Sequence, residues 1–352
     1  MIDTIDFPKS AEIFQLFSPA FAMEYPAVWH KDLIPEPILE TMETSWRTPQ
    51  YLQRSVTFYR LNDVYIAEEG LIFDAQGQLY RNTVTQHSQG EIERGHLAVQ
   101  TAIQNKIAAL ADPHVLCIKR GISNYGHWLM EMLPKAFLCR LYGIPGKIII
   151  PDPKGQLKSV IRESMAMLQI NEEQVLCMNF SPIHFDSVVV VDGLTAHGVY
   201  MSPLVINCAD ALSARVRGGS AKKLLVTRNG VASRRLINED DVWQRAVTAG
   251  YSLLDTSRLS LSEQIAAFLN ATHIVGVMGA ALTNVVFAPR GASVLNFAPA
   301  TMPDTFFWFI AGLKGQHYAE VRCRQVGPIK GVARWDTDLE VNSDDIDAIF
   351  PR

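Results

Sequence analysis

The stretch Ile274-Val-Gly-Val-Met-Gly-Ala-Ala-Leu-Thr-Asn284 indicates most directly how this chain folds. Apolar, β-branched residues at 273–277 predict a buried strand, and the small residues after them predict a tight turn that leads into a helix. Such a turn presents free backbone N–H groups at the carboxyl end of a strand, where an anion can bind. Gly276 and Gly279 leave room for a diphosphate, and Thr283 and Asn284 can add side-chain donors. Close packing in any α/β domain explains the same small residues, so both interpretations remain open at this point.

Strand and helix patterns alternate on both sides of this stretch, which predicts parallel sheets. The first alternating series covers about 97–217 and includes a helix at 127–142, and the second covers about 223–320 and includes a helix at 280–289. Gly218-Gly219-Ser220 is the best boundary between them. We therefore predict an α/β protein with two Rossmann-like lobes facing a cleft. The expected parts are a β-rich N-terminal region at 1–95 belonging to the first lobe, a Rossmann-like lobe at 96–218, a second at 219–334, and a C-terminal segment at 335–352 packing back on the first lobe.

Composition excludes several classes of protein. The 352 residues are 48% hydrophobic and 19% charged, which is typical of a well-packed globular protein. A net charge of −4 argues against a nucleic-acid partner, because neutralising phosphates requires a basic surface. The five cysteines form no CxxC pair, and the chain has neither a signal-peptide pattern nor an apolar run of about 18 residues. We expect a cytoplasmic protein, and peripheral contact with the inner face of the membrane stays open.

The loop after the second series' first strand contains three arginines, Arg228, Arg234 and Arg235. Ligands collect at the carboxyl ends of strands in such sheets, and guanidinium groups bind diphosphates with paired hydrogen bonds. We interpret Arg228, at the strand's end, as a ligand contact and Asn238 as the N-cap of the next helix. Arg234 and Arg235 fit either a diphosphate clamp or a solvated loop.

A second turn rich in polar and aromatic residues lies in the first series, between a strand and a helix. Its sequence is Ser123-Asn-Tyr-Gly-His-Trp-Leu-Met-Glu-Met-Leu-Pro134. His127 and Glu131 are four residues apart and share a helix face. A neutral imidazole can take a proton from a hydroxyl while a carboxylate orients it, and Glu131 itself could be the base. A packing histidine beside Trp128, with Glu131 paired to a lysine, explains the same pattern.

Other chemistries find little support in the sequence. Asp336-Thr-Asp338 has the spacing of two cation ligands, but helix capping explains it more simply. The remaining histidines, including His197, show no metal-ligand spacing. A serine-hydrolase elbow, a P-loop and a complete GxGxxG are absent from the sequence.

Three segments in register resemble glycosyltransferase family 61. They are Asn124-Tyr-x-His-Trp-Leu-x-Glu-x-Leu-Pro134, Thr227-Arg with Arg234-Arg-x-x-Asn-Glu239, and Gly276-x-x-Gly-Ala-x-Leu-Thr-Asn284. The resemblance covers about residues 50–320. This family includes capsular polysaccharide biosynthesis proteins of bacteria and is related to plant xylosyltransferases and animal O-linked GlcNAc transferases.

The resemblance implies a GT-B fold and an inverting transfer from a nucleotide sugar, without an obligatory metal or other cofactor. The acceptor would be a saccharide or lipid-linked saccharide in surface polysaccharide synthesis. Arg228, Arg235 and the amides of Gly279 and Ala280 would offset the charge on the leaving diphosphate, and His127 or Glu131 would be the base. The acceptor would be held by Asn124, Tyr125 and Trp128. The donor would be held by Arg228, Arg234, Arg235, Asn238, Glu239, Gly276, Met278, Gly279, Ala280, Leu282, Thr283 and Asn284.

One position departs from the family pattern. Most members have histidine where this chain has Met278, and methionine can neither carry charge nor donate to a phosphate oxygen. Three explanations are open: another residue such as Arg228 or Thr283 supplies the contact that the histidine would make, the donor differs, or catalysis is lost. We favour the first. The alternative function is a non-catalytic nucleotide- or glycan-binding scaffold of a polysaccharide assembly complex.

Overall fold

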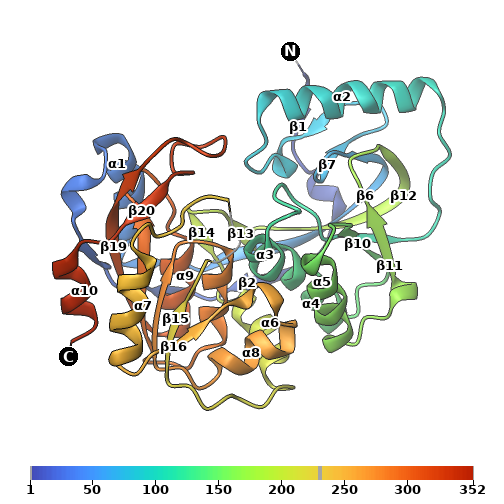
Figure 1. Cartoon of the computed structure of the whole chain (residues 1–352). Helices are drawn as coiled ribbons and strands as arrows, with labels where there is room; N and C mark the ends of the chain where they lie inside the picture. The colour runs from blue at the N-terminus through green and yellow to red at the C-terminus, as the bar shows by residue number, and fades with distance from the viewer. Residues whose placement is uncertain (1, 229–231, 352) are drawn as a thin grey trace. The chain divides into compact units, whose positions relative to one another are not determined.

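The computed structural model describes residues 2–228 and 232–351 and divides into two compact units (Figure 1). Unit 1 comprises the chain up to Pro19, Gln53–His197 and Met201–Cys208. Unit 2 comprises Ala20–Leu52, Gly198–Tyr200 and the chain from Ala209 onward. Both units contain helices and parallel strands, so the prediction of an α/β protein is confirmed.

Unit 1 is built on a mixed nine-stranded sheet. Its strands, in spatial order, are β1 (Thr4–Ile5), β8 (Leu79–Tyr80), β7 (Leu71–Phe73), β6 (Arg54–Ala67), β12 (Ile183–Asp192), β9 (His114–Leu116), β10 (Lys147–Pro151) and β11 (Val175–Met178), with β2 (Glu12–Ser18) beside β6. The last four in this order are parallel to one another, and β6 is antiparallel to β12. The helices are α2 (Gln89–Gln104), α3 (Tyr125–His127), α4 (Leu133–Leu141) and α5 (Gln156–Met167). The parallel half therefore has its carboxyl ends along one edge, where ligands collect in such sheets.

The helix expected at 127–142 forms in three pieces. After α3, residues Trp128–Met132 make a π-helix, and α4 follows with Pro134 in its first turn. The Asn124 side chain caps α3 by accepting hydrogen bonds from the backbone N–H groups of Gly126 and His127, at 2.8 and 3.3 Å. Single π-turns inside helices are frequent at functional sites because they change the direction of the side chains after them.

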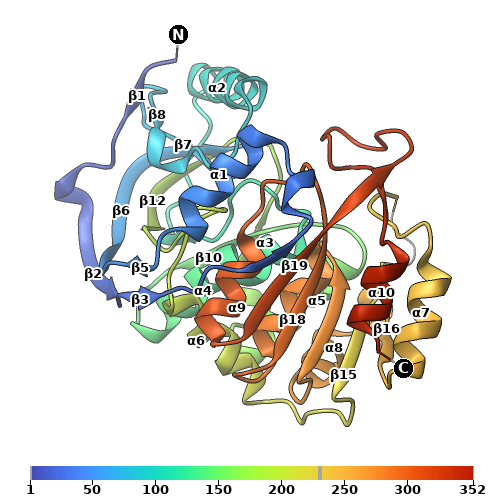
Figure 2. The same ribbon diagram turned by 90° about the vertical axis from the view of Figure 1, so that its left-hand side faces the viewer.

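Unit 2 is built on a seven-stranded sheet whose centre is parallel (Figure 2). Its strands, in order, are β16 (Ser252–Leu254), β15 (Lys223–Val226), β17 (His273–Val277), β18 (Ser293–Pro299), β19 (His317–Val326) and the antiparallel β20 (Asp338–Glu340), with β4 (Ala27–Trp29) also on β19. Its helices are α1 (Glu36–Trp46), α7 (Glu239–Thr248), α8 (Leu261–Phe268), α9 (Phe306–Lys314) and α10 (Ser343–Ile349). Helix α6 (Leu204–Ser213) begins in unit 1 and ends in unit 2, and the short strands are β3 (Phe21–Ala22), β5 (Gln50–Tyr51), β13 (Thr195–Ala196) and β14 (Tyr200–Met201).

The strand predicted at 273–277 is confirmed as β17, but the helix after it is not an α-helix. Residues Ala280–Phe287 form a 3₁₀ helix instead. Six consecutive residues, Leu282 to Phe287, are buried there, and several are β-branched. β-branched residues lose side-chain freedom in an α-helix, which disfavours the regular helix that was expected here.

The division into units differs from the expected domains at both ends of the chain. Residues 20–52 belong to unit 2, where β4 extends the sheet by pairing with β19. The C-terminal segment also belongs to unit 2: β20 pairs with β19, and Val341, Ile346 and Phe350 join the core beneath α7. Apolar side chains at these positions are buried by the nearest sheet, which sequence order does not reveal. Within the described residues, no helix is long and apolar enough to cross a membrane.

Candidate active site

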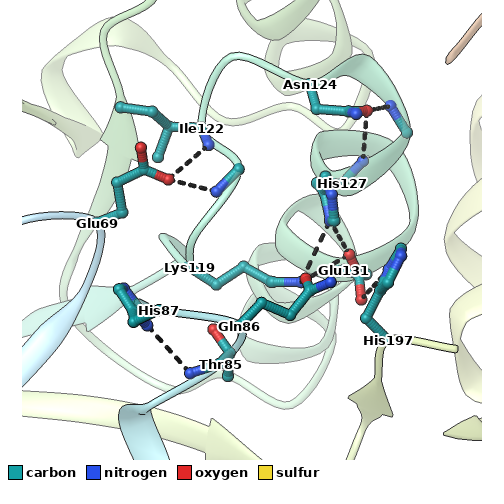
Figure 3. A network of polar contacts seen from close by, with 12 residues as sticks. Glu69, Thr85, Gln86, His87, Lys119, Ile122, Asn124, His127, Glu131 and His197 are labelled. Atoms are coloured by element: carbon teal, nitrogen blue, oxygen red, sulfur yellow. Dashed lines mark hydrogen bonds and ion pairs between the residues drawn. The ribbon is translucent and has the colours of Figure 1, made fainter. Parts of the chain in front are cut away.

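Four polar side chains of unit 1, Lys119, His127, Glu131 and His197, form what we call the His127 network (Figure 3). His127 Nδ1 hydrogen-bonds Glu131 Oε2, and Lys119 Nζ donates to the same oxygen at 2.8 Å. Lys119 Nζ also lies 3.2 Å from His127 Nδ1. His197 Nδ1 lies 3.4 Å from the other carboxylate oxygen, and the two imidazole rings are 4.7 Å apart. Glu131 therefore stands between two imidazoles and an ammonium group.

The loop before α3 holds His127 in place. Glu69 accepts hydrogen bonds from the backbone N–H groups of Gly121 and Ile122, which fixes the loop after β9. Gly121 has a φ of +98°, and a Cβ there would lie 2.7 Å from His127 Cδ2. Only glycine combines this backbone conformation with the close approach of the imidazole.

Protonation in the network follows from burial and charge. Burial of Glu131 would raise its pKa, but hydrogen bonds from His127 and His197 and the charge of Lys119 hold the pKa well below its ordinary value. Burial lowers the pKa of His127, and the charge of Lys119 acts in the same direction against the opposing effect of Glu131. At neutral pH Glu131 is thus a carboxylate and His127 a neutral imidazole. An Nδ1–H donated to Glu131 leaves Nε2 of His127 with a free lone pair, which is the state a general base needs.

The network also contains a potential metal-ligand set. One donor atom each of His127, Glu131 and His197 lie within 4.8 Å of one another, and two histidines with one carboxylate are typical metal ligands. The Lys119 ammonium, however, contacts both Glu131 and His127. A divalent cation would have to displace this charge, so the four residues fit proton handling better than metal binding.

In unit 2 the side chains of Arg228 and Arg234, which we call the arginine pair, converge on one backbone carbonyl. Their Nη1 atoms lie 3.5 and 3.3 Å from the carbonyl oxygen of Met278, at the end of β17. Arg228 also donates to the Ser233 carbonyl at 3.3 Å. A Cβ at Gly279 would lie 1.5 Å from Arg228 Nη1, so this glycine makes the approach possible.

The arginine pair lies near the carboxylates of Asp336 and Asp304 without a direct ion pair to either in the part of the chain that the structure describes. Both Nε atoms are buried without a hydrogen-bond partner, and neither guanidinium has a carboxylate ion pair among the described residues. Burial, together with repulsion from Arg234, lowers the pKa of Arg228 to about 10. Burial likewise lowers the pKa of Arg234. Two cations thus converge beside the carboxyl ends of β15 and β17, where ligands collect in parallel sheets.

Other residues singled out in the sequence have roles within the fold. Arg235 forms an ion pair with Asp338 at 3.4 Å, so it does not join the arginine pair, and Lys330 contacts the same Asp338. Asn238 occupies the N-cap position of α7 as expected, but its side chain makes no capping bond. The amide instead pairs with the backbone of Val341, at 2.7 and 3.3 Å. Glu239, the first residue of α7, is partly buried, and burial raises its pKa.

The residues around the 278–284 turn are mostly buried. Met278, Leu282, Thr283 and Asn284 have no exposed surface, and the Asn284 amide donates to Gln264 Oε1 and the Ala281 carbonyl. Gly276 allows close packing of β17, because a Cβ there would lie 3.1 Å from Leu282 and Val226. Ala280, which begins the 3₁₀ helix, stays partly exposed. Thr283 and Asn284 therefore lie in the core of unit 2 and Gly279 is buried, whereas Ala280 and Ala281 of this turn keep exposed surface, as does the partly exposed arginine pair.

Among the residues expected near an acceptor, Trp128 is fully buried and donates to Ser164 Oγ at 3.0 Å, and Tyr125 is partly exposed. Asn124 is committed to capping α3. Sequence spacing did not reveal Lys119 or His197, because they lie 8 and 70 residues from His127 and meet it only in the folded chain.

Comparison with known proteins adds one finding. Residues 125–295 match the family model of Glycosyltransferase 61. The match supports glycosyltransferase family 61 for this chain. It begins at the turn that carries His127 and ends after the strand and turn that carry Met278 and Gly279, so it includes the arginine pair and the His127 network except Lys119. The family implies a glycosyltransferase with donor and acceptor substrates. No curated protein matches the chain.

Proposed function

We propose that this protein is an inverting glycosyltransferase that uses a nucleotide-sugar donor without a metal ion. The arginine pair of unit 2 would hold the donor's diphosphate, and the His127 network of unit 1 would activate the acceptor. The observation that carries the proposal is the arginine pair, because two buried guanidinium groups without a carboxylate partner need an external anion. The family match supplies the reaction class.

The His127 network supports a single displacement. His127 Nε2 would take the proton of an acceptor hydroxyl while the hydroxyl oxygen attacks the anomeric carbon of the donor. The bond between that carbon and the diphosphate oxygen breaks in the same step, and its electron pair leaves with the nucleoside diphosphate. Attack from the face opposite the leaving group inverts the anomeric carbon. Glu131 would orient His127 and offset the imidazolium charge that forms, so we assign the base role to His127.

The arginine pair would act on the leaving group. Its positive charges would offset the negative charge that develops on the diphosphate, the part that a metal plays in other transferases. The Met278 carbonyl orients both guanidinium groups. Arg234 thus supplies a cation beside the position where most family members have histidine, which supports compensation for Met278. Arg235 would contribute less than the resemblance implies, since Asp338 already neutralises it.

The wider role follows from the resemblance and belongs to the same proposal. The two units would act as the lobes of a GT-B enzyme, in the cytoplasm or at the inner face of the membrane. The acceptor would be a saccharide or lipid-linked saccharide of a bacterial surface polysaccharide such as a capsule. Asn124, Tyr125 and Trp128 would shape the acceptor side through the turn they build.

Nucleotide binding and turnover test the proposal directly. Isothermal titration of the protein with UDP, GDP, ADP, CMP and TDP sugars should give binding to one nucleotide family that is abolished in Arg228→Met plus Arg234→Met. Nucleoside diphosphate should then be released in the presence of an acceptor, with EDTA leaving the rate unchanged. Binding without turnover towards any saccharide panel would favour the non-catalytic scaffold, for which the buried Met278 is the specific observation. Absence of nucleotide binding would overturn the proposed transferase and would leave a glycan-binding scaffold as the remaining alternative.

A further inference from the structure

Unit 1 contains a cavity of about 360 Å³ beside the His127 network. We call it the unit 1 cavity. It lies where the parallel strands β9 and β12 end, and residues following both strands line it. Lys119, Glu131 and His197 form part of its wall. The volume is enough for one or two sugar rings, and the cavity is therefore a place for the acceptor.

Lys135 lines the same cavity and has no ion-pair or hydrogen-bond partner among the described residues. It follows Glu131 by four residues, as Glu131 follows His127, so the three side chains stand one turn apart along the segment from α3 to α4. Burial lowers the pKa of Lys135 and the neighbouring charge of Lys119 acts in the same direction, against the opposing charges of Asp192 and Glu131. A partly buried ammonium of this kind gains by meeting a negative charge.

The other charges of the cavity limit what that negative group can be. Lys119 is already paired with Glu131 at 2.8 Å. Asp192 also lines the cavity, and its two oxygens accept hydrogen bonds from Gly193 N–H at 2.8 Å and from Asn82 Nδ2 at 3.3 Å. One ammonium is thus uncommitted, and a carboxylate faces the same space. A carboxylate brings the single negative charge that can pair with Lys135, whereas the double charge of a phosphate monoester would be repelled more strongly by Asp192 and Glu131.

We propose that the unit 1 cavity binds an acidic sugar of the acceptor, with its carboxylate on Lys135. Asp192 would accept hydrogen bonds from the sugar's hydroxyl groups. The inference rests on the proposed glycosyl transfer, since it names the class of acceptor: a saccharide containing a uronic acid or another sugar carboxylate. It also predicts that Lys135 controls acceptor affinity and has little influence on the donor.

Ligand-observed NMR on the intact chain tests this inference with three probes: methyl β-D-glucuronide, methyl β-D-glucoside and glucose 6-phosphate. We expect the glucuronide to bind at least tenfold more tightly than the other two. Lys135→Met should remove that preference, and Lys135→Arg should retain most of it. Lys147→Met, which changes an exposed lysine paired with Asp112, is the matched control and should bind like the unchanged protein.

Three results would overturn the inference. Equal binding of glucoside and glucuronide would show that no carboxylate subsite exists, and tighter binding of the phosphate would replace the carboxylate with another anion. Glucuronide binding that survives Lys135→Met, in a variant with an unchanged melting temperature, would place the subsite elsewhere. Failure of the proposed function looks different: the glucuronide would still bind through Lys135, while no nucleotide sugar binds to the arginine pair.

Discussion

The two groups of charged side chains in this protein differ in how their charges are balanced. In the His127 network of unit 1, a buried carboxylate is surrounded by two imidazoles and an ammonium group, so every charge has a partner inside the protein. In unit 2 the hydrogen-bond partners of the arginine pair among the described residues are backbone carbonyls and a thioether. This difference fits the proposed roles, in which the first group handles a proton and the second binds the diphosphate of the donor. Substitutions should therefore affect activity, stability and ligand binding differently in the two units.

Removing the imidazole of His127 should have the largest effect on the reaction. We expect His127→Ala to lower kcat about 100- to 10,000-fold, the usual contribution of a general base. Affinity for the nucleotide sugar should remain unchanged, because the donor is held by unit 2. Steady-state transfer rates and titration of the donor measure the two quantities. His96→Ala, on helix α2, is the matched control; a loss of kcat in both variants would remove His127 from the base role.

Removing the carboxylate of Glu131 should have the largest effect on stability. Glu131→Ala leaves Lys119 buried without its partner, and breaking such a pair costs about 3–5 kcal/mol of the free energy of unfolding. Urea denaturation would measure it. Glu93→Ala, an exposed glutamate on α2, should change stability by less than about 0.5 kcal/mol. Equal effects of the two substitutions would contradict the paired, buried network.

Substitutions in the arginine pair should weaken donor binding without lowering stability, the opposite of what we expect for Glu131. Arg228→Met and Arg234→Met should each weaken nucleotide-sugar binding about 10- to 150-fold, the value of about 1.5–3 kcal/mol for hydrogen bonds to a charged group. Neither should lower the melting temperature, because each relieves repulsion between buried cations. Arg324→Met, whose side chain is 75% exposed, is the control. Arg235→Met should weaken nucleotide-sugar binding less than Arg228→Met or Arg234→Met does, since Asp338 neutralises Arg235. A larger effect of Arg235→Met would mean that Arg235, and not the arginine pair, holds the donor.

Gly279→Ala should give a smaller loss of the same kind. The added Cβ would occupy the place of Arg228 Nη1, so the guanidinium must move away from the turn. We expect donor affinity to fall about tenfold, as for one lost charge-assisted contact. Combining Gly279→Ala with Arg228→Met should cost little more than Arg228→Met alone, and full additivity in a titration would disprove the coupling.

The smallest effect that we expect is the change of the transfer rate with pH near neutrality. The pKa of His127 lies below the ordinary value of about 6.5, so the imidazole is neutral and active at pH 7. The rate constant kcat/KM should be flat above pH 6.5 and should fall as the pH drops through the lowered pKa. Stability changes with the same sign, because the unfolded chain binds protons at a higher pH than folded His127 and Glu131 do. A pH–rate profile measures kcat/KM, and urea titrations at pH 5–8 measure the stability. A further rise of kcat/KM above pH 7 would be inconsistent with this assignment of the base.

Local patterns in the sequence determined the elements whose side chains are buried by their immediate neighbours. The strand at 273–277 forms with the predicted bounds, because a run of apolar β-branched residues is readily buried in a parallel sheet. The spacing of His127 and Glu131 likewise places them on one helix face, and Arg228 lies two residues after the end of β15. These relations depend on a few consecutive residues, so the sequence contains them.

Only the tertiary structure decided which charges meet. Lys119 and His197 come from a strand's end and a distant loop, and no spacing connects them to Glu131. Arg234 rather than Arg235 joins Arg228, because Asp338, about a hundred residues later, takes Arg235 into an ion pair. The inclusion of both chain ends in unit 2 follows from pairing with β19, and the 3₁₀ helix at 280–287 is buried against α8, α9 and β17. Contacts between distant segments set these outcomes, and burial strengthens each charge interaction, so residue order alone could not reveal them.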